Sequence, residues 1–475
     1  MAISAFSKTA FLMAMAAISF IPSILHLPNP KSKWSFYSIF VNYTQQKLHF
    51  LSFLSFIIDK KYNFAENYNY KRQMILISRQ QYLDKIERYL GKDTIIILTG
   101  QRRVGKSVVL RLFKDKVSAT PDNNIIYINK EKKEFDEIKN YHDLNAYIDG
   151  HRDESKMNYV LVDEIQDIEE FEKSVRSYYE EPDIKLIITG SNSKTLSSDL
   201  SSKIGGRYKE IYVQALSYEE FLLFHNLTDD DEALSKYIQL GGLPGLVRYG
   251  LDEQDAREYQ TDVINTVLLK DVVMRNQIRN VPFLENLVRF LADNTGKIIS
   301  ANSIAKYMKS QGEKITTTAI TNYAKFLCDA YMLHKVNRYD IHGKRLFESN
   351  DKYYFEDNGI RNALAGGTRE GDIEKVIENV IYNHLTRLGY EVNVGQLQAG
   401  EIDFVCTKPG GQRAYVQASY IIADKSTHDR EFGNLHAIKD NYPKYVISLT
   451  PLVTRADDNG VTHLHLRKFL TEGLG

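Results

Sequence analysis

The chain has 475 residues and a formal net charge of zero, with 26% charged residues. One hydrophobic core rarely extends over such a length, so two or three domains are expected. The balanced charge excludes a protein that binds nucleic acid through its overall charge and leaves only local basic patches. The two cysteines, Cys328 and Cys406, exclude a disulfide framework and a tetra-cysteine zinc site, as is usual in a reducing compartment.

Residues 1–73 differ in composition from the rest of the chain and form an atypical hydrophobic N-terminal extension. The first acidic residue is Asp59, and serine and proline interrupt the apolar run 10–27. Three interpretations stay open: a membrane anchor or signal peptide, a soluble extension, and a reading frame begun too early for a protein that starts at Met74.

A glycine-rich loop follows the first predicted strand of the remaining chain. After an amphipathic helix over 81–90, the apolar, β-branched run 93–99 predicts a strand buried on both faces of a parallel sheet. The loop matches G-x-x-x-x-G-K-[ST], and an apolar helix follows it, which is the context that this motif needs. We predict that it binds nucleotide through Gly100, Gln101, Arg102, Arg103, Val104, Gly105, Lys106 and Ser107.

The residue types of this loop fit the chemistry of a triphosphate. Gly100 and Gly105 permit backbone torsions that turn successive N–H groups toward phosphates at a helix N-terminus. Lys106 places a positive charge at the β- and γ-phosphates, and Ser107 offers a hydroxyl group to Mg²⁺. The loop therefore predicts ATP and Mg²⁺ as cofactors.

A second predicted strand, 159–162, ends in two acids, Asp163 and Glu164. We expect this strand to neighbour the first strand of the sheet. Asp163 would then hold Mg²⁺ through water, and Glu164 would polarise the attacking water as the general base.

Two further segments supply candidate phosphate contacts. The predicted strand 184–189 leads into a polar segment in which Asn192 is suited to sensing the γ-phosphate. Arg207 follows two glycines and precedes another strand. It is predicted to act as an arginine finger on a phosphate of its own chain or of a neighbouring subunit, and the alternative is an ion pair with a surface acid.

Six segments carry a resemblance to a known family: Thr99–Ser107, Leu161–Gln166, Thr189–Asn192, Gly206–Arg207, Leu216–Phe221 and Gly241–Gly245. In these segments the chain resembles bacterial and archaeal ATPases that join an AAA domain to a C-terminal domain of unknown function. The resemblance spans roughly residues 75–470 and implies an AAA-like parallel α/β sheet and ATP hydrolysis. It also includes Arg102 and Arg103, without assigning them a role.

The segment 281–356 predicts three helices followed by two strands, which is the order of a winged helix. A winged helix can place its third helix in a DNA groove, and lysines such as Lys306, Lys309 and Lys325 would then contact phosphates. The alternative is that these lysines form a solvated face and that the segment docks against another domain.

The segment 357–475 resembles the restriction-endonuclease-like α/β fold, with Glu378 and Asp403 where two metal-binding acids would lie. Active members carry Glu-x-Lys at a strand where this chain has Gln417 and Ser419. An amide is a weak Mg²⁺ ligand and serine carries no positive charge, so we expect a catalytically inactive domain. Glu401 and Asp403 would then pair with neighbours such as Lys408 or Arg413.

These patterns predict an AAA-type ATPase domain over 74–225, a helical lid or linker over 226–280, the winged-helix segment and the C-terminal domain. The expected function is Mg²⁺-dependent ATP hydrolysis that moves the C-terminal domains. The first alternative is a nucleotide-gated DNA-binding module, and an active nuclease is the weaker one. Expected partners are ATP, DNA, an unknown protein and a second copy of the chain. The need for ATP predicts a cytoplasmic location, with membrane association if the N-terminal extension is native.

Overall fold

The computed structural model describes residues 79–192, 204–312, 315–343, 345–346, 350–367, 370–398 and 400–475. The chain divides into two compact units, Met1–Gln73 and Met74–Gly475, and the fold below is that of the second. The predictions made for residues 1–73 lie outside the described residues. In the ranges above, every helix is too short or too polar to cross a bilayer.

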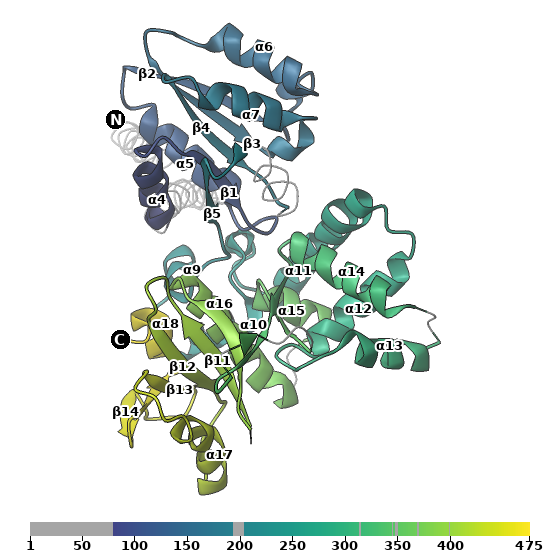
Figure 1. Ribbon diagram of the computed structural model, residues 1–475, viewed down its shortest axis with the longest axis vertical. Helices are drawn as coiled ribbons and strands as arrows, with labels where there is room; N and C mark the ends of the chain where they lie inside the picture. The colour runs from purple at the N-terminus through teal and green to yellow at the C-terminus, as the bar shows by residue number, and fades with distance from the viewer. Residues whose placement is uncertain are drawn as a thin grey trace, which may run out of the picture. The chain divides into compact units, whose positions relative to one another are not determined.

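A parallel five-stranded sheet with the order β2-β3-β4-β1-β5 forms the first part of this unit (Figure 1). Alternate residues of β1 point to opposite faces. Ile96 and Leu98 pack with α4 and α5, while Ile95 and Ile97 pack with α6 and α7. The predicted strand buried on both faces is therefore confirmed. The elements are α4 (Gln80–Leu90), β1 (Ile95–Thr99), α5 (Lys106–Val117), β2 (Asn123–Asn129), α6 (Tyr141–His151), β3 (Met157–Asp163), α7 (Phe171–Tyr179), β4 (Ile184–Thr189) and β5 (Tyr208–Tyr212).

The sheet order corrects one expectation about the acidic strand. β3 does not neighbour β1, because β4 pairs in parallel with both strands and lies between them. Thr189, the last residue of the intervening strand β4, forms hydrogen bonds with both Asp163 and Glu164.

Helices follow the first sheet. The N-cap of α9 is Ser217, which forms a reciprocal capping box with Glu220 and so fixes the point at which the chain leaves the sheet. α11 continues without a break into η5, a π-helix. The elements of this segment are α9 (Tyr218–His225), α10 (Asp231–Leu240), α11 (Glu253–Thr266) and η5 (Val267–Met274).

The middle segment contains the three predicted helices, each with a side-chain N-cap, namely Asn280, Ser300 and Thr316. An antiparallel pair of strands, β6 and β9, follows the helices. The elements are α12 (Val281–Asp293), α13 (Ala301–Ser310), α14 (Thr317–Asp329), β6 (Leu333–Val336) and β9 (Lys352–Phe355), with α15 (Asn358–Leu364) after them.

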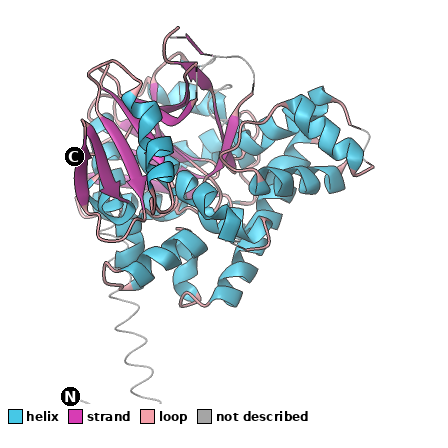
Figure 2. Cartoon of the chain, turned by 90° about the horizontal axis from the view of Figure 1, so that it is seen from below, coloured by secondary structure: helices cyan, strands magenta, loops and turns pink. Residues whose placement is uncertain are grey.

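A mixed eight-stranded sheet with the order β14-β15-β13-β12-β11-β10-β7-β8 forms the last part of this unit. Figure 2 shows the strands of the chain in magenta and its helices in cyan. β7 and β8 come from the middle segment of the sequence, and β7 pairs in parallel with β10. α16 and α18 cover one face and α17 the other. The elements are β7 (Arg338–Asp340), β8 (Arg345–Leu346), α16 (Ile373–Arg387), β10 (Glu391–Gln396), β11 (Glu401–Thr407), β12 (Arg413–Ala418), α17 (Lys425–His436), β13 (Lys444–Ser448), β14 (Arg455–Asp458), β15 (Val461–His465) and α18 (Leu466–Glu472).

Candidate nucleotide-binding site

The glycine loop joins the end of β1 to the start of α5. Gly100 has a φ of 134°, and a Cβ atom there would lie 2.2 Å from the main-chain oxygen of Val213, so only glycine fits. Gly105 is the N-cap of α5 with a φ of 102°. The first N–H groups of a twelve-residue helix are therefore directed into the loop, which is the geometry that binds phosphate.

Lys106 is buried beneath this loop, with 4% of its surface exposed. Its Nζ donates to the main-chain oxygens of Gly100 at 2.9 Å and Gln101 at 3.0 Å. Burial lowers the pKa of Lys106, and the nearby charge of Glu164 opposes that effect. The ammonium group is thus held within the loop, where a phosphate chain would replace the two carbonyl contacts.

Asp163 lies at the end of β3 and joins three elements. Its Oδ1 accepts hydrogen bonds from Ser107 Oγ at 3.1 Å and from Thr189 Oγ1 at 2.6 Å. Burial raises the pKa of Asp163, and these two hydrogen bonds lower it in part. The structure therefore brings together the serine and the aspartate that the sequence predicts as the metal-binding pair.

Glu164 follows in the left-handed backbone region, with a φ of 57°. It is the residue after the strand, and only 6% of it is exposed. Burial alone would raise its pKa, but the charges of Lys106 and Arg102 outweigh burial and hold the pKa of Glu164 below its ordinary value. Glu164 is thus ionised at neutral pH, and Gln166 donates a hydrogen bond to its carboxylate.

Several buried polar atoms of this site lack a hydrogen-bond partner among the described residues. They include Oδ2 of Asp163 and both amide atoms of Gln101, whose side chain is fully buried. Leaving such groups unpaired costs about 1–3 kcal/mol each, so their position favours a site that is completed by a ligand. Their oxygen and amide chemistry fits a hydrated Mg²⁺ and a phosphate chain.

No group of three or more His, Cys, Asp or Glu side chains in the described part of the chain is placed to hold a metal ion by itself. Ser107 and Asp163 would therefore provide two contacts, and phosphate oxygens and water the others. This is how proteins usually bind Mg²⁺ in nucleotide sites.

Arg102 is the most strongly paired residue of the loop. Its Nε and one terminal nitrogen contact the two carboxylate oxygens of Asp271, in η5, at 2.9 and 3.0 Å. The hydrogen bond to Asp271 raises the pKa of Arg102. Ser191 Oγ lies 3.4 Å from the same carboxylate, and Asn192 beside it is 2% exposed. Asn192 thus lies at the same edge of the sheet as the loop.

The remaining predicted residues lie apart from this centre. Arg103 is exposed, with a φ of 73°. Arg207 precedes β5, next to Ile95 at the start of β1, whereas the loop follows the other end of β1. Arg207 is half-exposed and forms an ion pair with Glu180 at 2.7 Å. It therefore lies away from the nucleotide loop of its own chain, and the prediction of a finger on its own phosphate is wrong.

Sequence reasoning missed three residues of the site: Thr189, Asp271 and Arg79. The signals were present for two of them, since a polar residue ends a buried strand at Thr189 and an acid interrupts an apolar run at Asp271. Arg79 precedes α4 without a motif. It is 2% exposed and donates to the main-chain oxygens of Val104 at 3.0 Å and Gln214 at 3.2 Å.

Arg79 also begins a line of buried charges that leaves the loop. Glu220 lies 3.9 Å from Arg79 and 3.4 Å from Arg387 of α16. Arg387 also donates to the main-chain oxygen of Ala215. One carboxylate thus joins the nucleotide loop to a helix of the second sheet.

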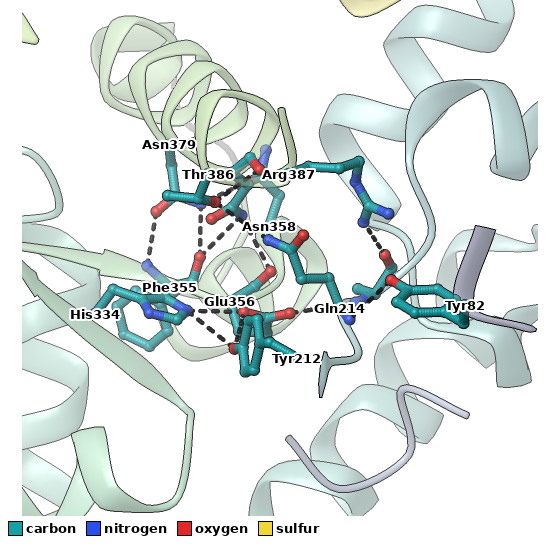
Figure 3. Close-up of polar contacts among 12 residues, drawn as sticks. Tyr82, Tyr212, Gln214, His334, Phe355, Glu356, Asn358, Asn379, Thr386 and Arg387 are labelled. Atoms are coloured by element: carbon teal, nitrogen blue, oxygen red, sulfur yellow. Dashed lines mark hydrogen bonds and ion pairs between the residues drawn. The ribbon is translucent and has the colours of Figure 1, made fainter. Parts of the chain in front are cut away.

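A second junction, drawn in Figure 3, centres on Glu356, which is 3% exposed. Its carboxylate accepts from the hydroxyl of Tyr212 at 2.6 Å and from the main-chain N–H of Ala215 at 3.2 Å. His334 Nε2 lies 2.7 Å away. Beside it, Gln214 donates to Thr386 at 3.2 Å. The end of β5 is therefore tied by hydrogen bonds to β6, β9 and α16.

The acids of the C-terminal sheet have a partner that the sequence did not predict. Nζ of Lys352, in β9, lies 2.8 Å from Glu378, 2.6 Å from Glu401 and 3.3 Å from Asp403. The expected pairing of Glu401 and Asp403 with Lys408 or Arg413 is wrong, because β9 places a buried ammonium group between the acids.

Gln417 and Ser419 occupy the strand position where the sequence predicts a departure from active nucleases. The side-chain oxygen of Gln417 accepts from the N–H of Asp403 at 3.3 Å. The hydroxyl of Ser419 is buried without a partner among the described residues. The ammonium group of Lys352 lies between the acids next to this strand.

The parallel sheet, the glycine loop and the two acids define an α/β domain that resembles P-loop NTPases. A family model described as an AAA domain matches residues 92–222, and one described as a domain of unknown function (DUF8612) matches residues 231–371. An uncharacterized protein of Haemophilus influenzae is 33% identical over 380 residues, which are 78% of this chain and 93% of that protein. The chain belongs to the family of this Haemophilus protein.

Two further proteins are similar to the chain. The uncharacterized protein MJ1544 of Methanocaldococcus jannaschii is 27% identical over 412 residues, which cover 82% of this chain and 88% of that protein. Among solved structures, a Walker-type ATPase of Pyrococcus abyssi is 19% identical, with a TM-score of 0.43, and the match covers 60% of this chain and 95% of that one.

Proposed function

We propose that the protein is a Mg²⁺-dependent ATPase that converts ATP to ADP and phosphate. The observation that carries the proposal is the meeting of Lys106, Ser107, Asp163 and Glu164 at one edge of the parallel sheet, where Oδ2 of Asp163 is buried and has no hydrogen-bond partner among the described residues. In this proposal the glycine loop binds the phosphates and Ser107 and Asp163 hold Mg²⁺. Glu164, kept ionised, takes the proton of the attacking water. Such an enzyme needs the ATP of the cytoplasm.

A pair of variants tests this function. Glu164→Gln is expected to bind MgATP like the wild type and to hydrolyse it roughly 10²- to 10⁴-fold more slowly, which is the usual contribution of a general base. Lys106→Ala is expected to weaken both binding and turnover. Calorimetric titration with MgATP and a phosphate-release assay measure the two effects, and a wild type that ignores MgATP would refute the proposal.

We further propose that nucleotide state is transmitted to the C-terminal domains, organised as 226–280, 281–356 and 357–475 after the ATPase domain 74–225. Two observations support this coupling. The first is the set of contacts in which Arg79 binds the main-chain oxygen of Val104 and Glu220 joins Arg79 to Arg387. The second is the contact of Glu356 with the end of β5. Both begin at or beside the nucleotide loop. A movement of the loop would thus change the contacts of α16.

The second candidate function is a nucleotide-gated DNA-binding module. It is favoured by the exposed lysines Lys306, Lys309 and Lys325 on α13 and α14, whose apolar faces are buried. Filter binding of duplex DNA with ATP, ADP or no nucleotide tests it. Retention that falls steeply with salt and changes with nucleotide would support this function.

Two smaller proposals remain. Arg207 acts across an interface between copies of the chain, and sedimentation with a non-hydrolysable ATP analogue tests whether such copies assemble. The C-terminal domain is catalytically inactive, and Mg²⁺-dependent DNA cleavage that is lost in Asp403→Ala would contradict this.

A further inference from the structure

An acid from the helical segment after the ATPase domain reaches into the nucleotide site. Asp271 is 1% exposed, and both of its carboxylate oxygens contact Arg102 of the glycine loop, at 2.9 and 3.0 Å. A two-point contact of this kind is the one that a guanidinium group also makes with phosphate. Asp271 thus holds Arg102 in the way that a nucleotide phosphate would.

The contact belongs to a group of interacting charges of both signs. Asp271, Glu164 and Asp163 each favour the charged form of Lys106, which places all of them in one electrostatic group. Arg102 and Arg275 act in turn on Glu164. The basic groups are Lys106, Arg102 and Arg275, and the acidic groups are Asp163, Glu164, Asp167 and Asp271.

A triphosphate brings several negative charges into this group, which already contains acids. Asp163 and Glu164 lie at the end of a central strand and are needed for the metal ion and the water. Asp271 has no part in that chemistry and lies on a separate helix. It is therefore the acid that is free to leave when phosphates arrive.

The helix that carries Asp271 is of an unusual kind. η5 is a π-helix of eight residues, Val267–Met274, that continues α11. π-helical turns are rare and frequent at functional sites, and they use i→i+5 in place of i→i+4 hydrogen bonds. A return to α-helical geometry would change the direction in which the side chain of Asp271 points.

We propose that Asp271 competes with the nucleotide phosphates for Arg102. The acid stabilises Arg102 when no nucleotide is bound, and Arg102 exchanges the carboxylate for phosphate oxygens when ATP binds. Asp271 is therefore a positioning residue that acts through Arg102 and sets the nucleotide affinity. This inference rests on the proposed ATPase function.

Calorimetric titration with MgATP tests the proposal. Asp271→Asn keeps the shape of the side chain and removes its charge, and it is expected to lower the Kd about tenfold or more. The matched control is Glu131→Gln, because Glu131 also lies near Arg102, at 3.5 Å, but is 56% exposed. The control is expected to change the Kd by less than about twofold, as exposed pairs contribute little. An unchanged or higher Kd in Asp271→Asn would overturn the proposal.

Two further measurements separate this inference from a structural role and from the proposed function. In an Arg102→Ala background the gain from Asp271→Asn should disappear, and a gain that persists contradicts competition for Arg102. In the wild type, hydrogen exchange of the amides in 267–274 should speed up on addition of MgATP, which needs no variant to fold, and unchanged protection overturns the proposal. A wild type that binds no MgATP would instead refute the ATPase function.

Discussion

The hydroxyl group of Thr189 donates a hydrogen bond to Oδ1 of Asp163 at 2.6 Å. The hydroxyl oxygen of Thr189 in turn accepts a hydrogen bond from the main-chain N–H of Glu164 at 3.0 Å. One side chain at the end of β4 thus positions Asp163, the last residue of β3, and Glu164, the residue after it. It also compensates for the fact that the loop and the acids lie on strands that do not touch.

Thr189→Val is expected to slow ATP hydrolysis about tenfold or more. The variant keeps the shape of the side chain but removes one of the two hydrogen bonds to Oδ1 of Asp163 and leaves the N–H of Glu164 without its acceptor, and a buried N–H without a partner costs about 1–3 kcal/mol. Thr189→Ser is the matched control, since it keeps the hydroxyl group and should retain most of the turnover. Steady-state phosphate release measures both, and wild-type turnover in the valine variant would contradict the positioning role.

Glu220→Gln is expected to lower the free energy of unfolding by about 3 kcal/mol. The variant removes the acid between Arg79 and Arg387, and a buried charge that loses its partner is costly. Urea denaturation measures the change. Glu219→Gln, one residue earlier and exposed, should shift the free energy by no more than about 0.5 kcal/mol. Equal effects of the two variants would show that Glu220 does not join the arginines.

Lys352→Met is expected to destabilise the fold by about 3 kcal/mol or more at pH 8, because three acids then lose their buried cation. Burial already raises the pKa of Glu378 to about 7, and the loss of the ammonium group raises it further. The folded variant therefore takes up protons at a higher pH than the folded wild type does, so the deficit relative to the wild type should shrink as the pH falls to 5. Denaturation at both pH values measures this. Lys335→Met, on the same strand pair and 46% exposed, should show a small deficit that does not change in this way.

Asp357 should make the protein lose stability as the pH rises from about 4 to about 6. Burial raises the pKa of Asp357 from 3.8 to about 6. Between these values the folded state holds a proton that the unfolded chain has released, so this group's contribution of about 3 kcal/mol is present below pH 4 and lost above pH 6. Thermal unfolding from pH 4 to 7 measures the slope, and Asp357→Asn should flatten it. Parallel curves for the two proteins would contradict the pKa shift.

The sequence was sufficient for the local elements of the nucleotide site. The strand, glycine loop and helix around Lys106 follow from residue types over a few positions, and so do the capping residues of α13 and α14. The order of the strands was not predictable in this way. Nothing in the composition of β4 says that it separates β1 from β3, because the pairing of parallel strands depends on long connections.

Contacts between segments that are distant in the sequence could not be predicted from local sequence patterns either. The partner of Arg102 lies 169 positions away, and the ion-pair partner of Glu378 is Lys352, from a strand before α16. From the sequence alone, a lysine in a strand is expected to be exposed to solvent unless the acids that pair with it in the fold are known. The prediction for Arg207 was wrong for the same reason. The glycine-arginine pattern does not indicate whether the arginine will lie at the end of the sheet that carries the nucleotide loop or at the opposite end.

The pairing of β7 with β10 in the second sheet has a practical consequence for expressing parts of the chain. A clone that starts near residue 357 would lack two strands of its own sheet and would expose the flank of β10 as an open edge. Such fragments should aggregate through this edge. A fragment that starts before α12 would contain every strand of that sheet.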